Sequence, residues 1–260
     1  MKVTLISDTH TKHRFCENDL PGGDLLIHAG DFMNSGYSPR EAMEFFDWFN
    51  NLSNYDTKVL IAGNHDRWME DKPEEARGIL SGYKNIEYLQ DEDLVLYFDG
   101  PNGDYPEDNV RIWGSPWQPE FYNWAFNLPR NGEDLREKWS LIPPNTDILI
   151  THGPAQTYVD TSGAPYNEPN LGCELLKERV ELIKPKIHVC GHIHGGYGHY
   201  YNGHTHFFNA SILNEQYSYA NLPITFDWDQ ATKLSTRVGR QVRLASRISK
   251  RAFNTRVSNA

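Results

Sequence analysis

The sequence predicts an α/β fold in which strands and helices alternate along one large domain. Short runs of aliphatic and β-branched residues recur through the chain, and such runs are typical of buried strands. Segments with apolar residues at helical spacing lie between several of these runs, as in folds built on parallel strands. Polar side chains follow five of the strands, at the edge where ligands bind in open α/β sheets.

The first two strands each end in a side chain that can bind a metal. Residues 3–6 lead into Asp8 and His10. A carboxylate and an imidazole two residues apart can converge on one divalent cation, although an Asp-x-His pair alone is a weak signal. Residues 25–29 form the second strand and deliver Asp31, which a simple turn would also explain.

The segments beside these strands have a structural explanation. His13 is expected in an exposed loop. Ser38, Pro39 and Glu41 are typical of a helix start, with Ser38 as the cap. The apolar residues that follow at helical spacing are expected to pack on a sheet, and they are Ala42, Phe45, Phe46 and Phe49.

The third strand, residues 58–62, leads into Asn64 and His65. An amide oxygen is an acceptable ligand for a hard cation, and a neighbouring histidine can act on a substrate, but Gly-Asn is also a common turn dipeptide. In the middle of the chain, a charged helix is expected at residues 70–80, followed by strands at residues 86–89 and 94–98. A loop at residues 99–108, a strand at residues 110–114 and a short helix at residues 132–139 are expected after them.

Residues 115–122 are dense in proline and aromatic side chains. They are interpreted as a packed loop or as an aromatic wall beside the site, on which a base could stack.

Two further strands, residues 146–150 and 186–190, flank a helix at residues 171–183 that ends before Pro185. Two imidazoles at positions i and i+2 of an extended segment point to the same side, so a pair after the second of these strands can face one site. The side chains that follow the two strands are His152, His192 and His194. Closing strands are expected at residues 206–210 and 224–228.

The net charge of −10 hides an asymmetry that divides the chain into residues 1–230 and 231–260. The second part has eight Lys or Arg and no acidic residue, so the first carries a formal charge of −18. Such a body repels nucleic-acid backbones except where a bound metal reverses the local sign. The tail is either a basic amphipathic helix that contacts an acidic surface, a membrane surface or nucleic acid, or a solvated extension.

Composition also bounds the cellular setting. Three widely spaced cysteines suggest reduced thiols rather than a disulfide framework, and no apolar run approaches the roughly 18 residues of a spanning helix. The first residues run straight into a strand pattern without signal-peptide features. We therefore expect a cytoplasmic protein without an integral membrane segment. The sequence leaves the oligomeric state open.

The order D-x-H, G-D, G-N-H-D, T-H-G and G-H-x-H over residues 1–228 resembles that of the calcineurin-like metallophosphoesterases. Within them, the stretches IHAGDF, VLIAGNHD, GSPWQPEFYNWAFNLPR, ILITHGP and HVCGHIHGGYG are similar to the metallophosphoesterase-domain-containing (MPPED-type) class III cyclic-nucleotide phosphodiesterases. The resemblance implies a four-layer α/β/β/α sandwich of two mixed sheets flanked by helices. Many members have Glu where this chain has Asp66.

The resemblance also implies a ligand set for two divalent metal ions, with Mn²⁺ expected and Fe, Zn²⁺ or Ni²⁺ as alternatives. The first metal would be held by Asp8, His10, Asp31 and His194. The second would be held by Asn64, His152, His192 and the shared Asp31. A hydroxide between the metals would attack the phosphate, and His65 would act as general acid.

The expected function is hydrolysis of phosphodiesters, most of all 2′,3′- or 3′,5′-cyclic nucleotides. A phosphomonoesterase or a nuclease could use the same metal core. A non-catalytic phosphate-binding protein is the remaining alternative, which the intact ligand set disfavours.

Overall fold

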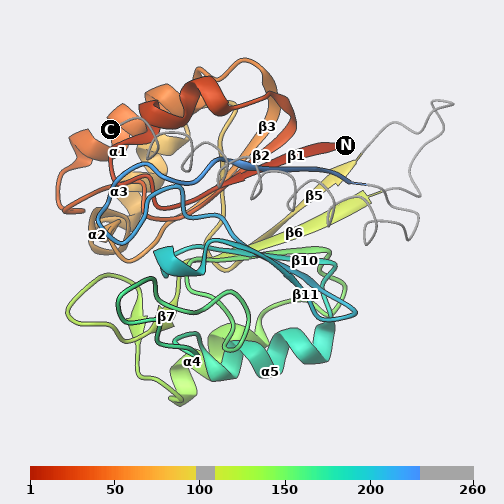
Figure 1. Cartoon of the computed structure of the whole chain (residues 1–260). Coiled ribbons are helices and arrows are strands. Elements are labelled where there is room, and N and C mark those ends of the chain that lie inside the picture. Colours follow the sequence, from red (N-terminus) through yellow and green to blue (C-terminus); the bar gives the residue numbers. More distant parts are fainter. Residues whose placement is uncertain (98–108, 229–260) are drawn as a thin grey trace, which may run out of the picture.

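A computed structural model describes residues 1–97 and 109–228. Its centre consists of two mixed β-sheets packed face to face, with helices on both outer faces (Figure 1). The predicted four-layer α/β/β/α sandwich is therefore confirmed. The expected loop at residues 99–108 and the basic tail at residues 231–260 lie outside the described residues.

The first sheet has five strands in the order β13-β1-β2-β3-β4. Strands β1 to β4 are parallel, and β13 pairs with β1 in the antiparallel direction. The bounds are β1 Lys2–Ile6, β2 Gly23–Ala29, β3 Tyr55–Ile61, β4 Glu87–Tyr88 and β13 Ile224–Asp227.

The second sheet has six strands in the order β11-β12-β10-β9-β6-β5. Its four central strands are parallel, and both edge strands are antiparallel to their neighbours. The bounds are β5 Glu92–Tyr97, β6 Asn109–Ser115, β9 Ile148–Thr151, β10 Ile187–Cys190, β11 Gly198–Tyr201 and β12 His206–Asn209. A small separate pair joins β7 Gln118–Pro119 to β8 Asn127–Leu128.

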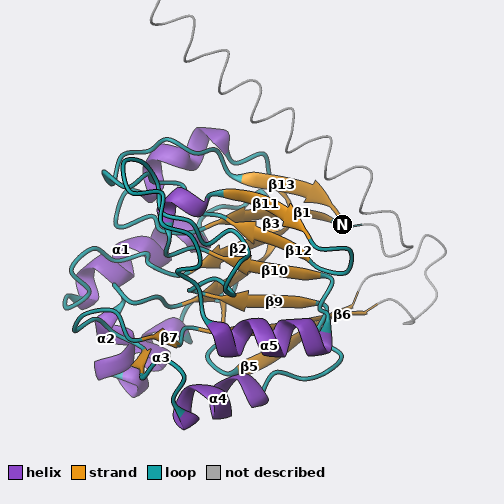
Figure 2. Ribbon diagram, turned by 60° about the horizontal axis from the view of Figure 1, so that its bottom comes forward, coloured by secondary structure: helices purple, strands orange, loops and turns teal. Residues whose placement is uncertain are grey.

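Helices cover the outer face of each sheet, as Figures 1 and 2 show. The first sheet is covered by α1 Pro39–Asn50, α2 Arg67–Asp71 and α3 Pro73–Leu80. The second is covered by α4 Glu133–Ser140 and α5 Glu174–Ile183. Two 3₁₀ helices, η1 His13–Asp19 and η2 His194–Gly196, lie near strand ends. Within the two described ranges, we find no helix long and apolar enough to cross a membrane.

Alternation along the strands divides the core into three layers. In β1, Leu5 faces the second sheet and Ile6 faces the helices, because successive side chains of a strand point to opposite faces. Gly114 of β6 marks a close approach of the sheets: a Cβ there would lie 2.7 Å from Ile61 and Leu89 side-chain atoms. The predicted apolar face of α1 is buried against the first sheet as expected.

Several local expectations are wrong in their boundaries. The helix expected over residues 70–80 is two helices that meet at Lys72, because Pro73 begins a new helix. The helix expected from residue 171 starts at Glu174, where the Cys173 sulfur accepts the Leu176 N–H. His13 is buried, at 5% exposure, against the rings of Phe45 and Trp48. Edge strand β11 was not expected at all.

Candidate metal centre

The structure brings all eight predicted site residues together at the carboxyl ends of five parallel strands. Three of these strands belong to the first sheet and two to the second, so the site lies where the edges of the two sheets meet. The residues follow their strands in this order: Asp8 and His10 after β1, Asp31 after β2, Asn64 and His65 after β3, His152 after β9, and His192 and His194 after β10.

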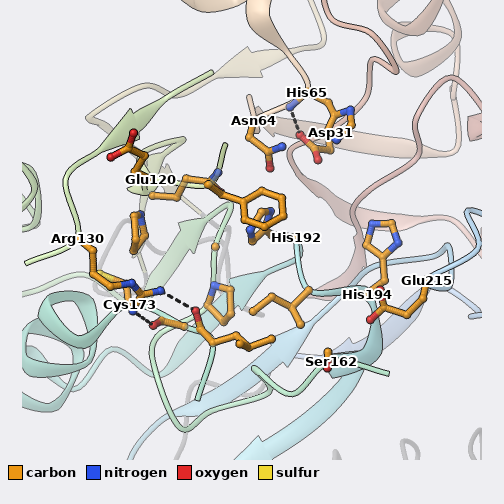
Figure 3. A pocket seen from close by; sticks show the side chains of 18 of the residues that line it. Asp31, Asn64, His65, Glu120, Arg130, Ser162, Cys173, His192, His194 and Glu215 are labelled. Carbon is orange, nitrogen blue, oxygen red and sulfur yellow. Dashed lines mark hydrogen bonds between the residues drawn. The ribbon is translucent and has the colours of Figure 1, made fainter. Parts of the chain in front are cut away.

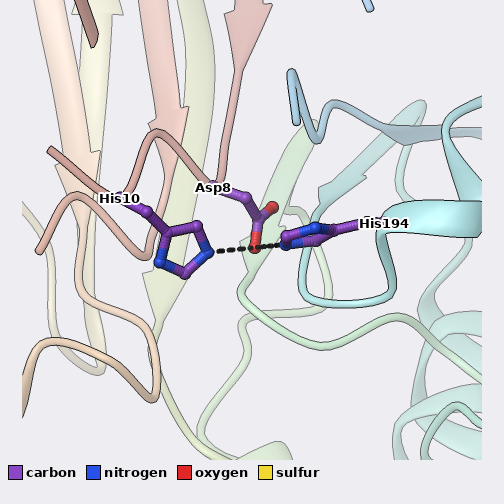
Figure 4. Close-up of side chains that lie close together, drawn as sticks. All are labelled: Asp8, His10 and His194. Carbon is purple, nitrogen blue, oxygen red and sulfur yellow. Dashed lines mark ion pairs between the residues drawn. The ribbon is translucent and has the colours of Figure 1, made fainter. Parts of the chain in front are cut away.

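One group of ligand-type atoms forms around Asp8. Its Oδ1 lies 3.4 Å from His194 Nε2 and 4.0 Å from His10 Nε2 (Figure 4). His10 Nε2 is also 3.7 Å from Asp31 Oδ2. One ligand atom from each of Asp8, His10 and His194 lies within 4.8 Å of the others, which is close enough for a single cation.

A second group forms around Asp31 and His152. The His152 Nε2 atom is 3.2 Å from Asp31 Oδ2 and 3.0 Å from Asn64 Oδ1. The His192 ring is next to it, with its centroid 5.2 Å from that of His152. Asp31 therefore has neighbours in both groups, and the chain has the geometry needed for a carboxylate shared between two cations.

Backbone carbonyls orient three of the imidazoles. Nδ1 of His10, His152 and His194 lies 3.1, 2.9 and 2.9 Å from the carbonyl oxygens of Met33, Ala29 and Asn214, respectively. A Nδ1–H that donates to a carbonyl leaves the Nε2 lone pair free for a metal, and this arrangement is usual around metal-binding histidines.

The donor set fits divalent cations. His10 Nε2 is buried and has no hydrogen-bond partner among residues 1–97 and 109–228. A buried polar atom without a partner is costly, and a cation bound there would satisfy it. Carboxylate, imidazole and amide donors without a thiolate suit first-row divalent metals.

Burial and neighbouring charges shift the pKa values of the ligands in different directions. Burial opposes ionisation of Asp8 and Asp31, yet the neighbouring imidazoles hold the pKa of both carboxyls well below the ordinary value. Burial lowers the pKa of His10 to about 4 and that of His192 to about 3, so both rings are neutral near pH 7. The Asp31 and Asp8 carboxylates act against burial and raise the pKa of His152 and His194, respectively, to about 9, so a cation would bind these two rings with release of a proton.

Asp66 holds the turn that carries Asp31. Its buried carboxylate accepts backbone N–H groups from Asp31 at 2.9 Å, Met33 at 2.8 Å and Gly63 at 2.7 Å. Burial and the Asp31 carboxylate raise the pKa of Asp66, and these N–H groups oppose the rise. Asp66 thus connects the turn that carries Asp31 to the turn that carries Gly63 and Asn64.

The ligand turns have unusual backbone geometry. Asp8, His10, Asp31 and His192 have φ values of +53°, +40°, +60° and +65°, which are uncommon for residues other than glycine and concentrate at functional sites. The expectation of an extended segment carrying His192 and His194 is therefore wrong, since His194 also begins η2. Both rings still line the same cavity.

Several supporting residues were missed because no local pattern marks them. Ser211 donates its hydroxyl to Asp8 Oδ2 at 2.7 Å, and the N–H of His192 donates to Asp8 Oδ1 at 3.0 Å. Asn209, at the end of β12, donates to the carbonyl of Ile193 at 2.8 Å and accepts the backbone N–H of Ser211 at 3.1 Å. A hydrogen-bonded layer from β12 thus holds the last ligand loop.

A cavity of about 340 Å³ extends from the ligand cluster (Figure 3). Asp31, Asn64 and His65 lie at one end, and Arg130 and Cys173 lie at the other. Residues 115–122 contain both packed and exposed aromatic side chains. Trp117 packs against the core, whereas Phe121 is 46% exposed on the cavity wall, with its ring centroid 5.5 Å from that of His192.

Comparison with known proteins places this geometry in a family. The sequence profile of calcineurin-like phosphoesterases matches residues 1–196. Human metallophosphoesterase domain-containing protein 1 is 40% identical over 247 residues, which cover 87% of this chain and 70% of that protein. UPF0046 protein T07D4.2 of Caenorhabditis elegans is 37% identical over 248 residues, covering 87% of this chain and 60% of that protein.

A solved structure shares the fold. The crystal structure of TT1561 of Thermus thermophilus matches with a TM-score of 0.54 and 14% identity, covering 80% of this chain and 88% of that one. The family implies a dinuclear divalent metal centre, and the Asp and His groups described above can hold metal ions. The chain therefore belongs to the calcineurin-like phosphoesterase family and is a metal-dependent phosphoesterase.

Proposed function

We propose that the protein hydrolyses phosphodiester bonds of small molecules, cyclic nucleotides above all, with His65 as the general acid. The orientation of His65 is the observation that supports this most. Its Nδ1 lies 2.6 Å from the Asn34 carbonyl oxygen, and its ring stacks on Trp124 with centroids 4.0 Å apart. With Nδ1 donating to that carbonyl, Nε2 is the ring atom left to exchange a proton with a substrate in the cavity.

The proposed ligands are those of the two groups, joined by Asp31. One cation would be held by Asp8, His10, Asp31 and His194, and the other by Asn64, His152, His192 and Asp31. Bound there, divalent cations would lower the pKa of a water and neutralise charge on the phosphoryl oxygens. Mn²⁺ is the proposed occupant, and Fe, Zn²⁺ and Ni²⁺ suit the same donors.

His65 would hold a proton at Nε2 and pass it to the ester oxygen that leaves, a contribution of about 10²–10⁴ in rate. The backbone N–H of His65 donates to Asp31 Oδ1 at 2.7 Å, so the acid and the shared ligand are positioned together. The role of Asn64 would be to ligate through Oδ1, which lies 3.0 Å from His152 Nε2.

The size and the lining of the cavity support the proposal of a substrate as large as a nucleotide. Its volume of about 340 Å³ lies within the range of small-molecule sites, and Phe121 offers a ring face for a base. The acidic body disfavours long nucleic acids, whose phosphates it would repel. A monoesterase is kept as an outcome of the test.

The test is a hydrolysis screen of the Mn²⁺-loaded protein. Substrates are 2′,3′- and 3′,5′-cyclic nucleotides, bis(p-nitrophenyl) phosphate and p-nitrophenyl phosphate, repeated with Fe²⁺, Zn²⁺ and Ni²⁺. We expect turnover of the diesters, and a protein that hydrolyses neither the cyclic nucleotides nor the aryl diester would refute the proposal. Faster turnover of the monoester would reassign the substrate class.

A second arm tests the acid. His65→Ala should lose about 10²–10⁴ in kcat and keep its metal content. The matched control is His204→Ala, because His204 is an exposed histidine of the β11–β12 turn. Loss of both metals from His65→Ala would show that this residue is a ligand instead.

A further inference from the structure

The segment from Asn214 to Ser218 borders the ligand cluster on the side of His10 and His194. Tyr217 places its ring edge-on against both, with centroid distances of 4.8 Å to His10 and 5.2 Å to His194. The ring of His65 is 6.3 Å away. Tyr217 is 38% exposed and lines the same cavity as Asp31, so it is placed to meet whatever binds there.

The backbone presents this tyrosine in a strained conformation. Tyr217 has a φ of +56°, a genuine outlier for a bulky side chain that persists where the surroundings enforce it. The Tyr217 N–H donates to the Asn214 carbonyl at 2.8 Å, and the Asn214 N–H donates to the Ser218 carbonyl at 2.9 Å. The Lys12 ammonium donates to the Tyr217 carbonyl, which ties the turn to the loop that carries His10.

The same turn also orients a proposed ligand. The Asn214 carbonyl that accepts from Tyr217 N–H lies 2.9 Å from His194 Nδ1. The Asn214 side chain adds two contacts, accepting the N–H groups of Gln216 and Ser218 at 3.0 Å each. One preformed turn therefore sets both the His194 ring and the Tyr217 ring, which leaves little freedom between them.

The hydroxyl distinguishes a contact role from a packing role. Packing against His10 and His194 needs an aromatic ring alone, and phenylalanine would supply it. Among the described residues, no hydrogen bond uses the Tyr217 hydroxyl, whereas Tyr83, Tyr158 and Tyr219 donate theirs to carboxylates. A phosphoryl group bound beside this cluster would offer an anionic oxygen, to which the Tyr217 hydroxyl could donate a hydrogen bond.

We propose that Tyr217 is a substrate-contacting residue whose hydroxyl donates a hydrogen bond to a phosphoryl oxygen. This inference rests on the proposed phosphoester site. Tyr217 borders the site beside His10 and His194, and Phe121 borders it beside His192. One aromatic side chain therefore lies beside each of the two groups of proposed ligands, on either side of the proposed phosphoryl site. The class of ligand recognised is a phosphate or phosphoester oxygen, whatever the rest of the substrate.

The test compares Tyr217→Phe, which keeps the ring, with Tyr217→Ala, which removes it. The matched control is Tyr200→Phe, because Tyr200 of β11 is also exposed but does not line the cavity. Metal content is measured first. The Kd of inorganic phosphate for the Mn²⁺-loaded protein is then measured by calorimetry, alongside kcat and KM for whichever phosphoester the wild type hydrolyses.

We expect Tyr217→Phe to bind phosphate about 10-fold more weakly or worse, the usual effect of losing a hydrogen bond to a charged group, with metal content unchanged. KM should rise in parallel, and Tyr200→Phe should stay within about 2-fold of the wild type. A Tyr217→Phe protein within about 2-fold of the wild type overturns the proposal, even if Tyr217→Ala loses metal. A Mn²⁺-loaded wild type that binds no phosphate also overturns the proposal. Because phosphate binding needs no turnover, the effect of Tyr217→Phe on the Kd of phosphate can be measured even if the protein hydrolyses no diester.

Discussion

Replacing Asp66 by Ala or Asn measures how firmly the Asp31 turn is held. Asp66 Oδ2 accepts the N–H groups of Asp31 and Gly63, and Oδ1 accepts that of Met33. Asp66→Ala leaves three buried N–H groups without acceptors. At about 1–3 kcal/mol each, the free energy of unfolding should fall by at least about 3 kcal/mol. Asp66→Asn can keep its oxygen on two of the donors, so it should lose about 1–3 kcal/mol.

The assay is urea unfolding of the metal-free variants, paired with Mn²⁺ affinity by calorimetry. Because Asp66 positions the backbone of Asp31, we expect both variants to bind Mn²⁺ about 10–100-fold more weakly. The control is Asp160→Ala, since the buried Asp160 accepts two N–H groups, from Thr157 at 2.8 Å and Gly172 at 3.0 Å, in the loop before α5. It should lose stability and keep its Mn²⁺ affinity. An Asp66→Ala protein that loses less than about 1 kcal/mol, or that binds Mn²⁺ like the wild type, would show that Asp66 does not hold the Asp31 turn.

Three further predictions follow from single contacts. Gly191→Ala would place a Cβ in overlap with Asp8 Oδ2, so elemental analysis should find reduced bound metal in a protein with an unchanged circular dichroism spectrum. Trp124→Ala removes the ring stacked on His65, and kcat should fall about 10-fold, less than for His65→Ala, at unchanged metal content. Burial lowers the pKa of His188 to about 3, so the unfolded chain takes up a proton that the folded one excludes. The free energy of unfolding should therefore fall by about 2 kcal/mol between pH 7 and pH 5 on account of His188, and His188→Gln should show a correspondingly shallower slope in urea unfolding.

Each of these has an outcome that would contradict it. Full metal loading of Gly191→Ala would show that the Asp8 side chain can move away from the added methyl group and still bind metal. A Trp124→Ala enzyme with the wild-type kcat would mean that the Asn34 carbonyl alone orients His65. An identical pH slope for His188→Gln and the wild type would place the acid sensitivity in other residues.

The gathering of the candidate ligands could be predicted because its signal is local. Each candidate ligand follows a strand that its own apolar pattern reveals, and parallel strands bring their carboxyl ends to one edge. The prediction that His192 and His194 share one site holds even though the predicted local geometry is wrong. The two residues reach the site through a strained turn and a 3₁₀ helix instead of an extended segment. Position after a strand mattered more than conformation.

The supporting residues could not be predicted, because their partners are distant in sequence. Ser211 contacts Asp8 across 203 positions, and the Asn214 carbonyl reaches His194 from a turn that no motif marks. His13 illustrates the opposite error. A polar residue in a short irregular segment suggests exposure, but the tertiary packing of Phe45 and Trp48 buries its ring. Hydrogen-bonded supports and buried loops depend on the assembled fold, which a single sequence does not display.

The shared role of Asp31 is tested most directly by a crystal structure of the Mn²⁺-loaded protein with anomalous difference maps. We expect two peaks about 3.5–4 Å apart, both within bonding distance of the Asp31 carboxylate. One would be flanked by Asp8, His10 and His194, and the other by Asn64, His152 and His192. A single peak, or a pair of peaks of which one does not touch Asp31, would contradict that shared role.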